Sequence, residues 1–138
     1  MSAVNFDIGK TTKATWSIID PRTTVGQAWA PSVQLSIVLN GLIRITAPSP
    51  ISAHSSFTTA HPFPSANAIK PGPAGSVAYI MPGTLRSSVV IAADMKATSF
   101  ITGHNTEFPS DEPTILIQLP FVNGLVPEHV ILHDGACN

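Results

Sequence analysis

The lack of any sustained helical period is the feature that most constrains this chain. No stretch keeps apolar residues at a 3.6-residue spacing for three turns. The apolar residues instead form short runs that end at turn-forming residues, and the chain contains 13 prolines and nine glycines. Short apolar runs bounded by such residues are typical of strands. The pattern predicts an all-β domain of about eight strands, arranged as a sandwich or a barrel.

Length and charge limit the number of domains and the kinds of partner. A chain of 138 residues forms one domain, here 1–138, with a single core. Its net charge of -1 gives no basic surface for nucleic acid. Only 11% of the residues are charged, whereas 43% are hydrophobic. So little charge on a small domain suggests that part of the surface is covered, most simply by a second copy, and we expect a homodimer.

The sequence lacks the signals of a disulfide framework, of a membrane helix and of a signal peptide. The lone cysteine, Cys137, cannot form an internal disulfide or a cysteine zinc cluster. No run approaches about 18 apolar residues, so no membrane helix is expected. No apolar segment follows a basic start, so no signal peptide is expected and the default location is the cytosol.

The first half of the chain contains a candidate arm and three or four candidate strands. Residues 1–13 are expected to be an N-terminal arm or an edge strand, Ala14–Asp20 a strand, and Thr23–Ala30 a connector or strand. Asn40-Gly41 separates two apolar runs, and Asn-Gly is a strong hairpin signal because both residues tolerate positive φ. We therefore predict that Val33–Leu39 pairs with Leu42–Thr46.

The second half begins after a long proline-rich loop. Residues 47–74 contain His54 and His61, and loops of this length inside compact domains are often functional lids. Residues 75–93 have the pattern of a β-hairpin or strand-turn-strand, with the chain broken at Pro82-Gly83. Further strands are expected at Thr98–Thr102, Thr114–Leu119 and Val130–Leu132, with a polar connector over Gly103–Pro113.

The residues around these strands resemble the cupin superfamily, which are small jelly-roll β-barrels. The second cupin motif is G-x5-P-x-G-x2-H-x3-N, and its spacing is matched by Gly75, Met81, Gly83, Arg86 and Val90. The end of the first motif matches Gln34-x6-Gly41, with Gln27 and Trp29 near the positions of the two histidines. The segments Gly103–Pro109 and Pro127–His133 are also similar to small cupins of fungal natural-product pathways. The resemblance implies a single-domain cupin-like jelly-roll β-barrel.

The letters at the ligand positions depart from the cupin pattern. Cupin metal sites use three histidines and a glutamate, whereas this chain has Gln27, Trp29, Gln34 and Arg86 there. A guanidinium is always protonated and cannot ligate a metal. The resemblance therefore implies a cupin without the usual metal centre. No other cofactor is expected, because the chain has no Gly-rich phosphate loop or dinucleotide fingerprint.

Alternation along residues 33–39 places Gln34, Ser36 and Val38 on one face of a strand. If Gln34 faces the barrel interior, the opposite apolar face needs a cover from a second sheet, the N-terminal arm or a dimer partner. The alternative is that the apolar face is the core and Gln34 is solvated. Trp16 is expected to be a core aromatic residue.

The candidate site residues follow from these positions. Arg86 could bind a carboxylate, enolate or carbonyl oxygen, or it could be a turn arginine paired with Asp94 or solvated. Trp29 and Tyr79 would form an aromatic wall with hydrogen-bonding edges, or be plain core residues. The remaining candidate substrate-binding residues are Gln27, Gln34, Ser36, Met81 and Ser88.

The five histidines are interpreted mainly as surface residues. His129 and His133 would lie about 13 Å apart on one strand, too far to share a metal ion. His61 and His104 are the candidates for moving a proton, because histidine changes charge near neutral pH.

These observations favour a metal-independent enzyme that isomerises, cyclises or eliminates on an oxygenated, largely apolar metabolite. Catalysis would use Arg86, Tyr79 and a histidine around a bound conformer. Two alternatives stay open: a non-catalytic module that binds a small ligand or sugar, and a metal-dependent oxygenase with ligands from unconventional histidines. A structural jelly roll would also fit, because one fold hosts many functions.

Overall fold

The computed structural model describes residues 3, 5, 7–48, 75–99 and 102–131, and they form an all-β fold as predicted. None of the helices in these ranges has the length and hydrophobicity to span a membrane. The elements are β1 (Thr15–Ile19), β2 (Thr23–Ala28), β3 (Gln34–Asn40), β4 (Ile43–Ala47), β5 (Ser76–Ile80), α1 (Leu85–Ser88), β6 (Val89–Ala92), β7 (His104–Phe108), β8 (Thr114–Pro120) and the 3-10 helix η1 (Val122–Gly124).

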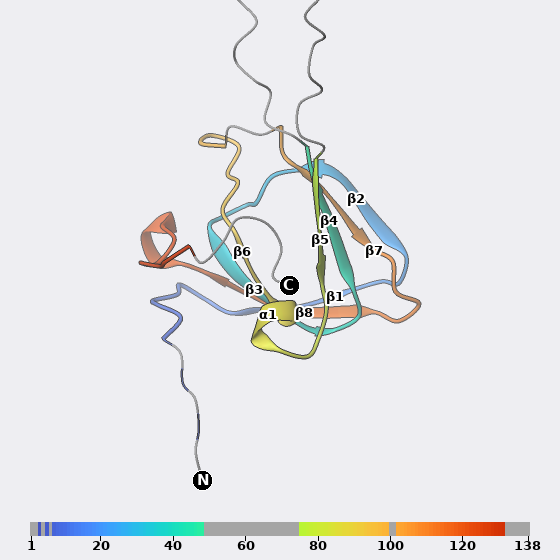
Figure 1. The fold of residues 1–138 in the computed structure, drawn as a ribbon, viewed down its shortest axis with the longest axis horizontal. Coiled ribbons are helices and arrows are strands. Elements are labelled where there is room, and N and C mark those ends of the chain that lie inside the picture. Colours follow the sequence, from blue (N-terminus) through green and yellow to red (C-terminus); the bar gives the residue numbers. More distant parts are fainter. Residues whose placement is uncertain (1–2, 4, 6, 49–74, 100–101, 132–138) are drawn as a thin grey trace, which may run out of the picture.

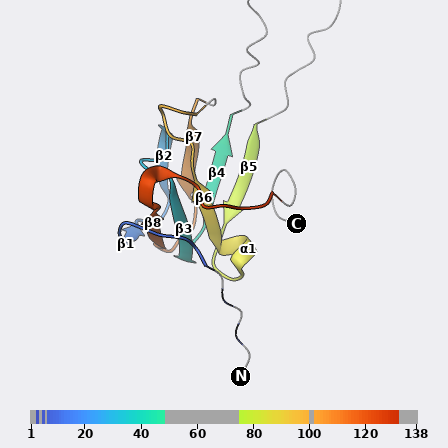
Figure 2. The same cartoon turned by 90° about the vertical axis from the view of Figure 1, so that its left-hand side faces the viewer.

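The strands form two four-stranded antiparallel sheets (Figures 1 and 2). The strand order is β1-β8-β3-β6 in one sheet and β2-β7-β4-β5 in the other. Each of the first four strands pairs with a partner counted back from the end: β1 with β8, β2 with β7, β3 with β6 and β4 with β5. The chain therefore crosses between the two sheets at most of its turns.

The predicted hairpin at Asn40-Gly41 is wrong. Strands β3 and β4 are consecutive, but they lie in different sheets. Gly41 does adopt positive φ, at 80°, but Asn40 stays in β3 and does not, so the chain bends here without forming the two-residue hairpin turn. The turn leads the chain across the sandwich, because β3 already has β8 and β6 on its two sides. Gly41 therefore determines where the chain bends, whereas the more distant strands β6 and β8 determine the pairing of β3.

Gly41 also provides a stability prediction. A Cβ there would lie 2.4 Å from Thr114 Oγ1 and 2.8 Å from Thr114 Cα. Gly41→Ala is therefore expected to lower the free energy of unfolding by about 2–3 kcal/mol, through the clash and the positive φ. Urea denaturation measures this. Gly26→Ala is the control, because a Cβ at Gly26 meets nothing within 4 Å. If Gly41→Ala lowers the free energy of unfolding no more than Gly26→Ala does, the close approach of Gly41 to Thr114 is contradicted.

Two further predicted strands are wrong in position. Thr98, Ser99 and Thr102 are not in a strand, and Phe100 and Ile101 lie outside the described residues. The strand lies later, at β7, inside the segment expected to be a polar connector. Val130 and Ile131 are also not in a strand. Polar residues are tolerated in β7 because alternate side chains face away from the interior.

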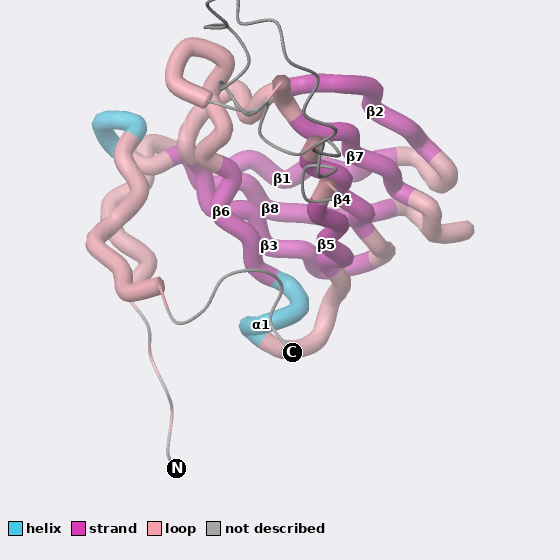
Figure 3. The backbone as a smooth tube through the Cα atoms, turned by 45° about the horizontal axis from the view of Figure 1, so that its top comes forward, coloured by secondary structure: helices cyan, strands magenta, loops and turns pink. Residues whose placement is uncertain are grey.

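Residues 75–93 form a strand-turn-strand rather than a hairpin. Strand β5 is followed by α1 and then by β6, and the two strands belong to different sheets. The helix begins after Thr84, which forms a capping box with Ser87. In Figure 3, α1 lies at the ends of β5 and β6.

The face of β3 that carries Gln34, Ser36 and Val38 lies in the interior of the sandwich. Gln34, Ser36 and Val38 are all buried, and Val38 packs in a cluster with residues from the opposite sheet. That cluster consists of Val38, Ile43, Ile80 and Phe108. Burial of these side chains contributes about 1.5–3 kcal/mol each and holds the two sheets together at this end.

The opposite face of β3 is covered by the chain itself. Val33 and Leu35 form a second buried cluster with Phe121, and Met95 and Val126 pack against it. The N-terminal arm lies alongside, since Thr12 N–H donates to the Pro120 carbonyl and Val122 N–H to the Lys10 carbonyl. The arm and the segment after β8 thus supply part of the cover that the sequence required.

Large side chains are exposed on the outer faces of both sheets. Trp16 and Ile18, on the outer face of β1, are 60% and 65% exposed, so Trp16 is not a core residue. On the outer face of the other sheet, Arg44 pairs with Glu107 across β4 and β7 at 2.5 Å. The hydrogen bond and charge of Glu107 raise the pKa of Arg44 above its ordinary value. Such an exposed pair adds little stability.

Candidate functional site

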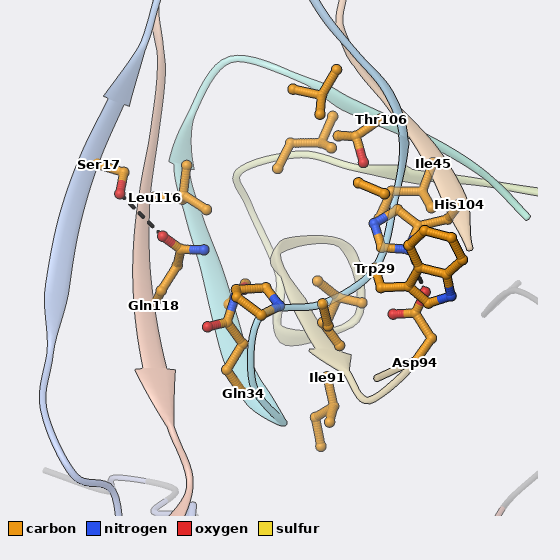
Figure 4. A pocket seen from close by; sticks show the side chains of 18 of the residues that line it. Ser17, Trp29, Gln34, Ile45, Ile91, Asp94, His104, Thr106, Leu116 and Gln118 are labelled. Atoms are coloured by element: carbon orange, nitrogen blue, oxygen red, sulfur yellow. Dashed lines mark hydrogen bonds and ion pairs between the residues drawn. The ribbon is translucent and has the colours of Figure 1, made fainter. Parts of the chain in front are cut away.

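A cavity of about 710 Å3 lies between the two sheets. Its size is within the range of small-molecule pockets. Most of its lining is apolar, from both sheets, and includes Ile19, Val25, Ile43, Ile45, Val90 and Leu116. The polar residues fall into two groups, which Figure 4 places on opposite sides of the cavity. One group contains His104 and Asp94, and the other contains Gln34, Gln118 and Ser17.

His104 and Asp94 form a hydrogen-bonded pair in the cavity wall. His104 is the first residue of β7, and Asp94 follows the end of β6. The distance from His104 Nδ1 to Asp94 Oδ2 is 2.6 Å, and each side chain is only 19% exposed. A half-enclosed pair of this kind is shielded from solvent more than a surface pair, so its geometry is better fixed.

The pair fixes which nitrogen of His104 faces the cavity. A carboxylate can only accept a hydrogen bond, so in neutral imidazole the proton lies on Nδ1 and Nε2 keeps its lone pair. Nε2 has no hydrogen-bond partner among the described residues, and Figure 4 shows it directed toward the cavity. His104 can therefore accept a proton from a bound molecule, and Asp94 would stabilise the imidazolium that forms.

Trp29 lies beside this pair, and the backbone of Gly103 packs closely against it. Gly103, directly before His104, has φ of 87°, and a Cβ there would lie 2.5 Å from the Ala28 carbonyl oxygen and 3.2 Å from the Trp29 ring. Lys96 lies over the Trp29 ring, with its Nζ 5.3 Å from the ring centroid. These contacts place Trp29 in the cavity lining as a flat apolar surface next to His104.

Two glutamine amides face the cavity from the other side. Gln34 on β3 and Gln118 on β8 are diagonal neighbours, because Ser36 pairs with Gln118. Their separation along the sheet is about 7 Å. Ser32 and Ser17 hydroxyls donate to the amide oxygens of Gln34 and Gln118, at 3.2 and 3.1 Å.

The serine contacts leave the amide nitrogens of both glutamines for a ligand. Neither NH2 group has a partner among the described residues. Figure 4 shows the Gln118 nitrogen on the cavity side and its oxygen toward Ser17. The two amides are therefore donors suited to a carbonyl, enolate or carboxylate oxygen.

The structure brings together four of the predicted site residues. His104, Trp29, Gln34 and Ser36 all line the cavity. The interpretation of Gln34 as a solvated residue is wrong, since it is only 6% exposed.

The other predicted residues lie outside the cavity lining. Arg86 is exposed on α1, at the end of the sandwich opposite the start of β7 (Figure 1). Its suggested partner Asp94 binds His104 instead. Tyr79 and Met81 are 55% and 43% exposed, because β5 turns these side chains outward. Gln27 donates to the Thr102 carbonyl, and Ser88 donates to the Thr84 carbonyl at 2.7 Å.

Several expected features lie outside the described residues. These are His54, His61 and the rest of the proposed lid up to residue 74, and also His133 and Cys137. His129 is exposed, and its Nδ1 lies 2.8 Å from the Pro127 carbonyl. Within the ranges the structure describes, no three His, Cys, Asp or Glu residues are grouped so as to hold a metal ion.

Sequence reasoning missed Asp94 and Gln118. The sequence suggests Arg86 as the partner of Asp94, although Asp94 directly follows an apolar run. Gln118 interrupts the apolar strand β8 on the same alternate positions as the buried Thr114 and Leu116. A polar residue on the buried face of a strand is the signal that could have identified Gln118.

Comparison of this chain with protein-family models, with curated proteins and with solved structures found no match.

Proposed function

We propose that this protein is a metal-independent enzyme that moves a proton on a small, oxygenated, largely apolar metabolite bound between its sheets. The observation that carries the proposal is the His104–Asp94 pair in the wall of a mostly apolar cavity, 2.6 Å apart. A histidine oriented by a carboxylate, facing an apolar space, is the arrangement used for general acid–base catalysis.

In the proposed reaction the cavity holds a carbonyl compound between the two polar groups. The amide nitrogens of Gln34 and Gln118 donate to its oxygen and stabilise the negative charge that develops there. His104 Nε2 removes a proton from the adjacent carbon, which leaves an enolate. Return of that proton to another carbon gives an isomer. Loss of a leaving group gives an elimination, and attack of the enolate carbon on a second carbonyl gives a ring.

The fold proposed here is the jelly roll that the cupin resemblance implies. The pairing of β1 with β8, β2 with β7, β3 with β6 and β4 with β5 supports this topology, because a jelly roll wraps a long antiparallel ribbon into two sheets. Membership of the cupin superfamily stays a prediction from motif spacing. Arg86, exposed on α1, has no part in the reaction proposed here.

A ring-opening probe tests the catalytic base. In 5-nitrobenzisoxazole, a base removes the proton on carbon 3, the N–O bond breaks, and the electron pair leaves on oxygen as a coloured cyanophenolate. We expect the protein to open the ring at least about 100 times faster than free imidazole at equal concentration. Absorbance of the phenolate measures the rate.

Binding of the probe is followed separately, through the NMR signal of the Trp29 indole N–H. The variant Trp16→Phe leaves Trp29 as the only tryptophan. A probe that shifts this signal but opens no faster than with free imidazole would contradict the enzyme proposal. That result would favour the alternative function, a module that binds a small ligand without turnover.

The homodimer and the cytosolic location stay predictions. The outer face of the β1-β8-β3-β6 sheet would be the surface that a second copy covers, because Trp16, Ile18 and Ile91 are exposed there. The small-molecule substrate is also a prediction, supported by the size of the cavity.

A further inference from the structure

A second, smaller cavity of about 400 Å3 adjoins the main one. The two cavities share three lining residues, Pro31, Gln34 and Gln118. The described residues that line only the smaller cavity are Lys13, Thr15, Ser32 and Pro120. Lys13 is the one charged residue among them, and none is a carboxylate. The glutamine pair therefore lies between an apolar space and a space that favours negative charge.

Gln34 provides independent evidence for a ligand at this junction. Gln34 is only 6% exposed, and it lines both cavities. Its amide oxygen accepts from Ser32, but its NH2 group has no partner among the described residues. The amide nitrogen is not sealed from the cavities, so a bound acceptor atom could satisfy it.

Lys13 adds a charge of the matching sign. It forms none of the ion pairs found among the described residues, so its ammonium group is available to a ligand. One ammonium group and two neutral amides balance a single negative charge. Phosphate sites more often use bidentate arginine pairs or several backbone N–H groups, which this cavity lacks within its described lining.

We infer that the smaller cavity binds a carboxylate, so that the substrate is an apolar carboxylic acid with its body in the main cavity. The carboxylate accepts one N–H of Gln34 and faces Lys13. The other Gln34 N–H and the Gln118 amide stay available for the carbonyl oxygen, and the carbon skeleton extends toward Trp29 and His104. This inference rests on the proposed function, because it names the class of molecule that the acid–base pair acts on.

Two ligands that differ only in charge test the inference. The ligands 4-phenylbutanoate and 4-phenylbutanamide have the same chain and the same ring. In the Trp16→Phe protein, titration of each is followed by the NMR shift of the Trp29 indole N–H. We expect the carboxylate to bind about tenfold more tightly at low salt, and the preference to shrink as salt is added.

Three variants assign the preference to the smaller cavity. Lys13→Met is expected to weaken carboxylate binding about threefold and to leave amide binding unchanged. Gln34→Glu keeps the side-chain shape but adds a negative charge, so it should weaken carboxylate binding by about tenfold or more. Lys10→Met is the matched control, because Lys10 lies on the same arm and lines neither cavity.

Equal affinities of the wild type for the two ligands would overturn the inference, as would failure of the carboxylate to bind. So would an equal effect of Lys13→Met and Lys10→Met. The titration involves no proton transfer, so its outcome is separable from the ring-opening assay. A carboxylate preference without ring opening would remove the enzyme proposal alone, and ring opening without the preference would remove the carboxylate site alone.

Discussion

Replacement of His104 by glutamine is expected to lower the second-order rate constant for opening of 5-nitrobenzisoxazole by at least about 100-fold. Glutamine keeps a polar side chain of similar reach but has no nitrogen lone pair that can accept a proton. Asp94→Asn should lower the rate by a comparable factor, because the asparagine NH2 can donate to Nδ1 and so place the imidazole proton on Nε2, and because a neutral amide cannot stabilise the imidazolium by charge. Phenolate absorbance under conditions below saturation measures both rates.

The control for His104 is His129→Gln. His129 is exposed and lies outside the cavity lining, so its loss should leave the rate unchanged. Far-UV circular dichroism and the Trp29 indole signal verify that the variants keep the fold and the cavity. Equal rates for the wild type and His104→Gln would show that another group is the base, and the acid–base role of the pair would be abandoned.

Phe108→Ala is expected to lower the free energy of unfolding by about 3–5 kcal/mol. Phe108 is 5% exposed and belongs to the cluster that joins the two sheets, with Val38 from one sheet and Ile43 from the other. Truncation removes apolar contacts and enlarges the space between the sheets. Because small domains are stable by only about 5–15 kcal/mol, this is a large fraction of the total.

Urea denaturation followed by circular dichroism measures the change in Phe108→Ala. Leu125→Ala is the control, because Leu125 is 69% exposed and should change stability by less than about 0.5 kcal/mol. A loss below about 1 kcal/mol in Phe108→Ala would contradict the packing of the two sheets around this ring.

The candidate site was only partly predictable from the sequence. Alternation along β3 correctly placed Gln34, Ser36 and Val38 on one face, because neighbouring side chains of a strand point to opposite sides. That this face is the buried one is decided by the structure. The same reasoning could not find the partner of His104, because Asp94 follows a different strand in the other sheet. The suggested pairing of Asp94 with Arg86 is wrong, because Arg86 lies on α1, at the end of the sandwich opposite the start of β7.

The errors in the fold have a similar origin. Asn40-Gly41 carries the local signal of a hairpin, and the chain does bend at Gly41, which has positive φ. Whether the strands on either side pair depends on the other strands of the fold, and β8 and β6 occupy both sides of β3, so no edge of β3 is left for β4. The placement of β7 was missed because its apolar residues are few, although His104, Thr106 and Phe108 face the interior.

The sequence by itself determined the all-β class, the positions of most strands and which residues of β3 share a face. These follow from turn residues and from a two-residue period, both of which act over a few neighbouring residues. Only the tertiary structure decided which strands pair, and hence that Asp94 meets His104 and that Gln34 lies beside Gln118. Asp94 and His104 are ten positions apart, but Asp94 follows a strand of the other sheet, and Ser17 bonds Gln118 across 101 positions, so no pattern within one strand encodes these contacts.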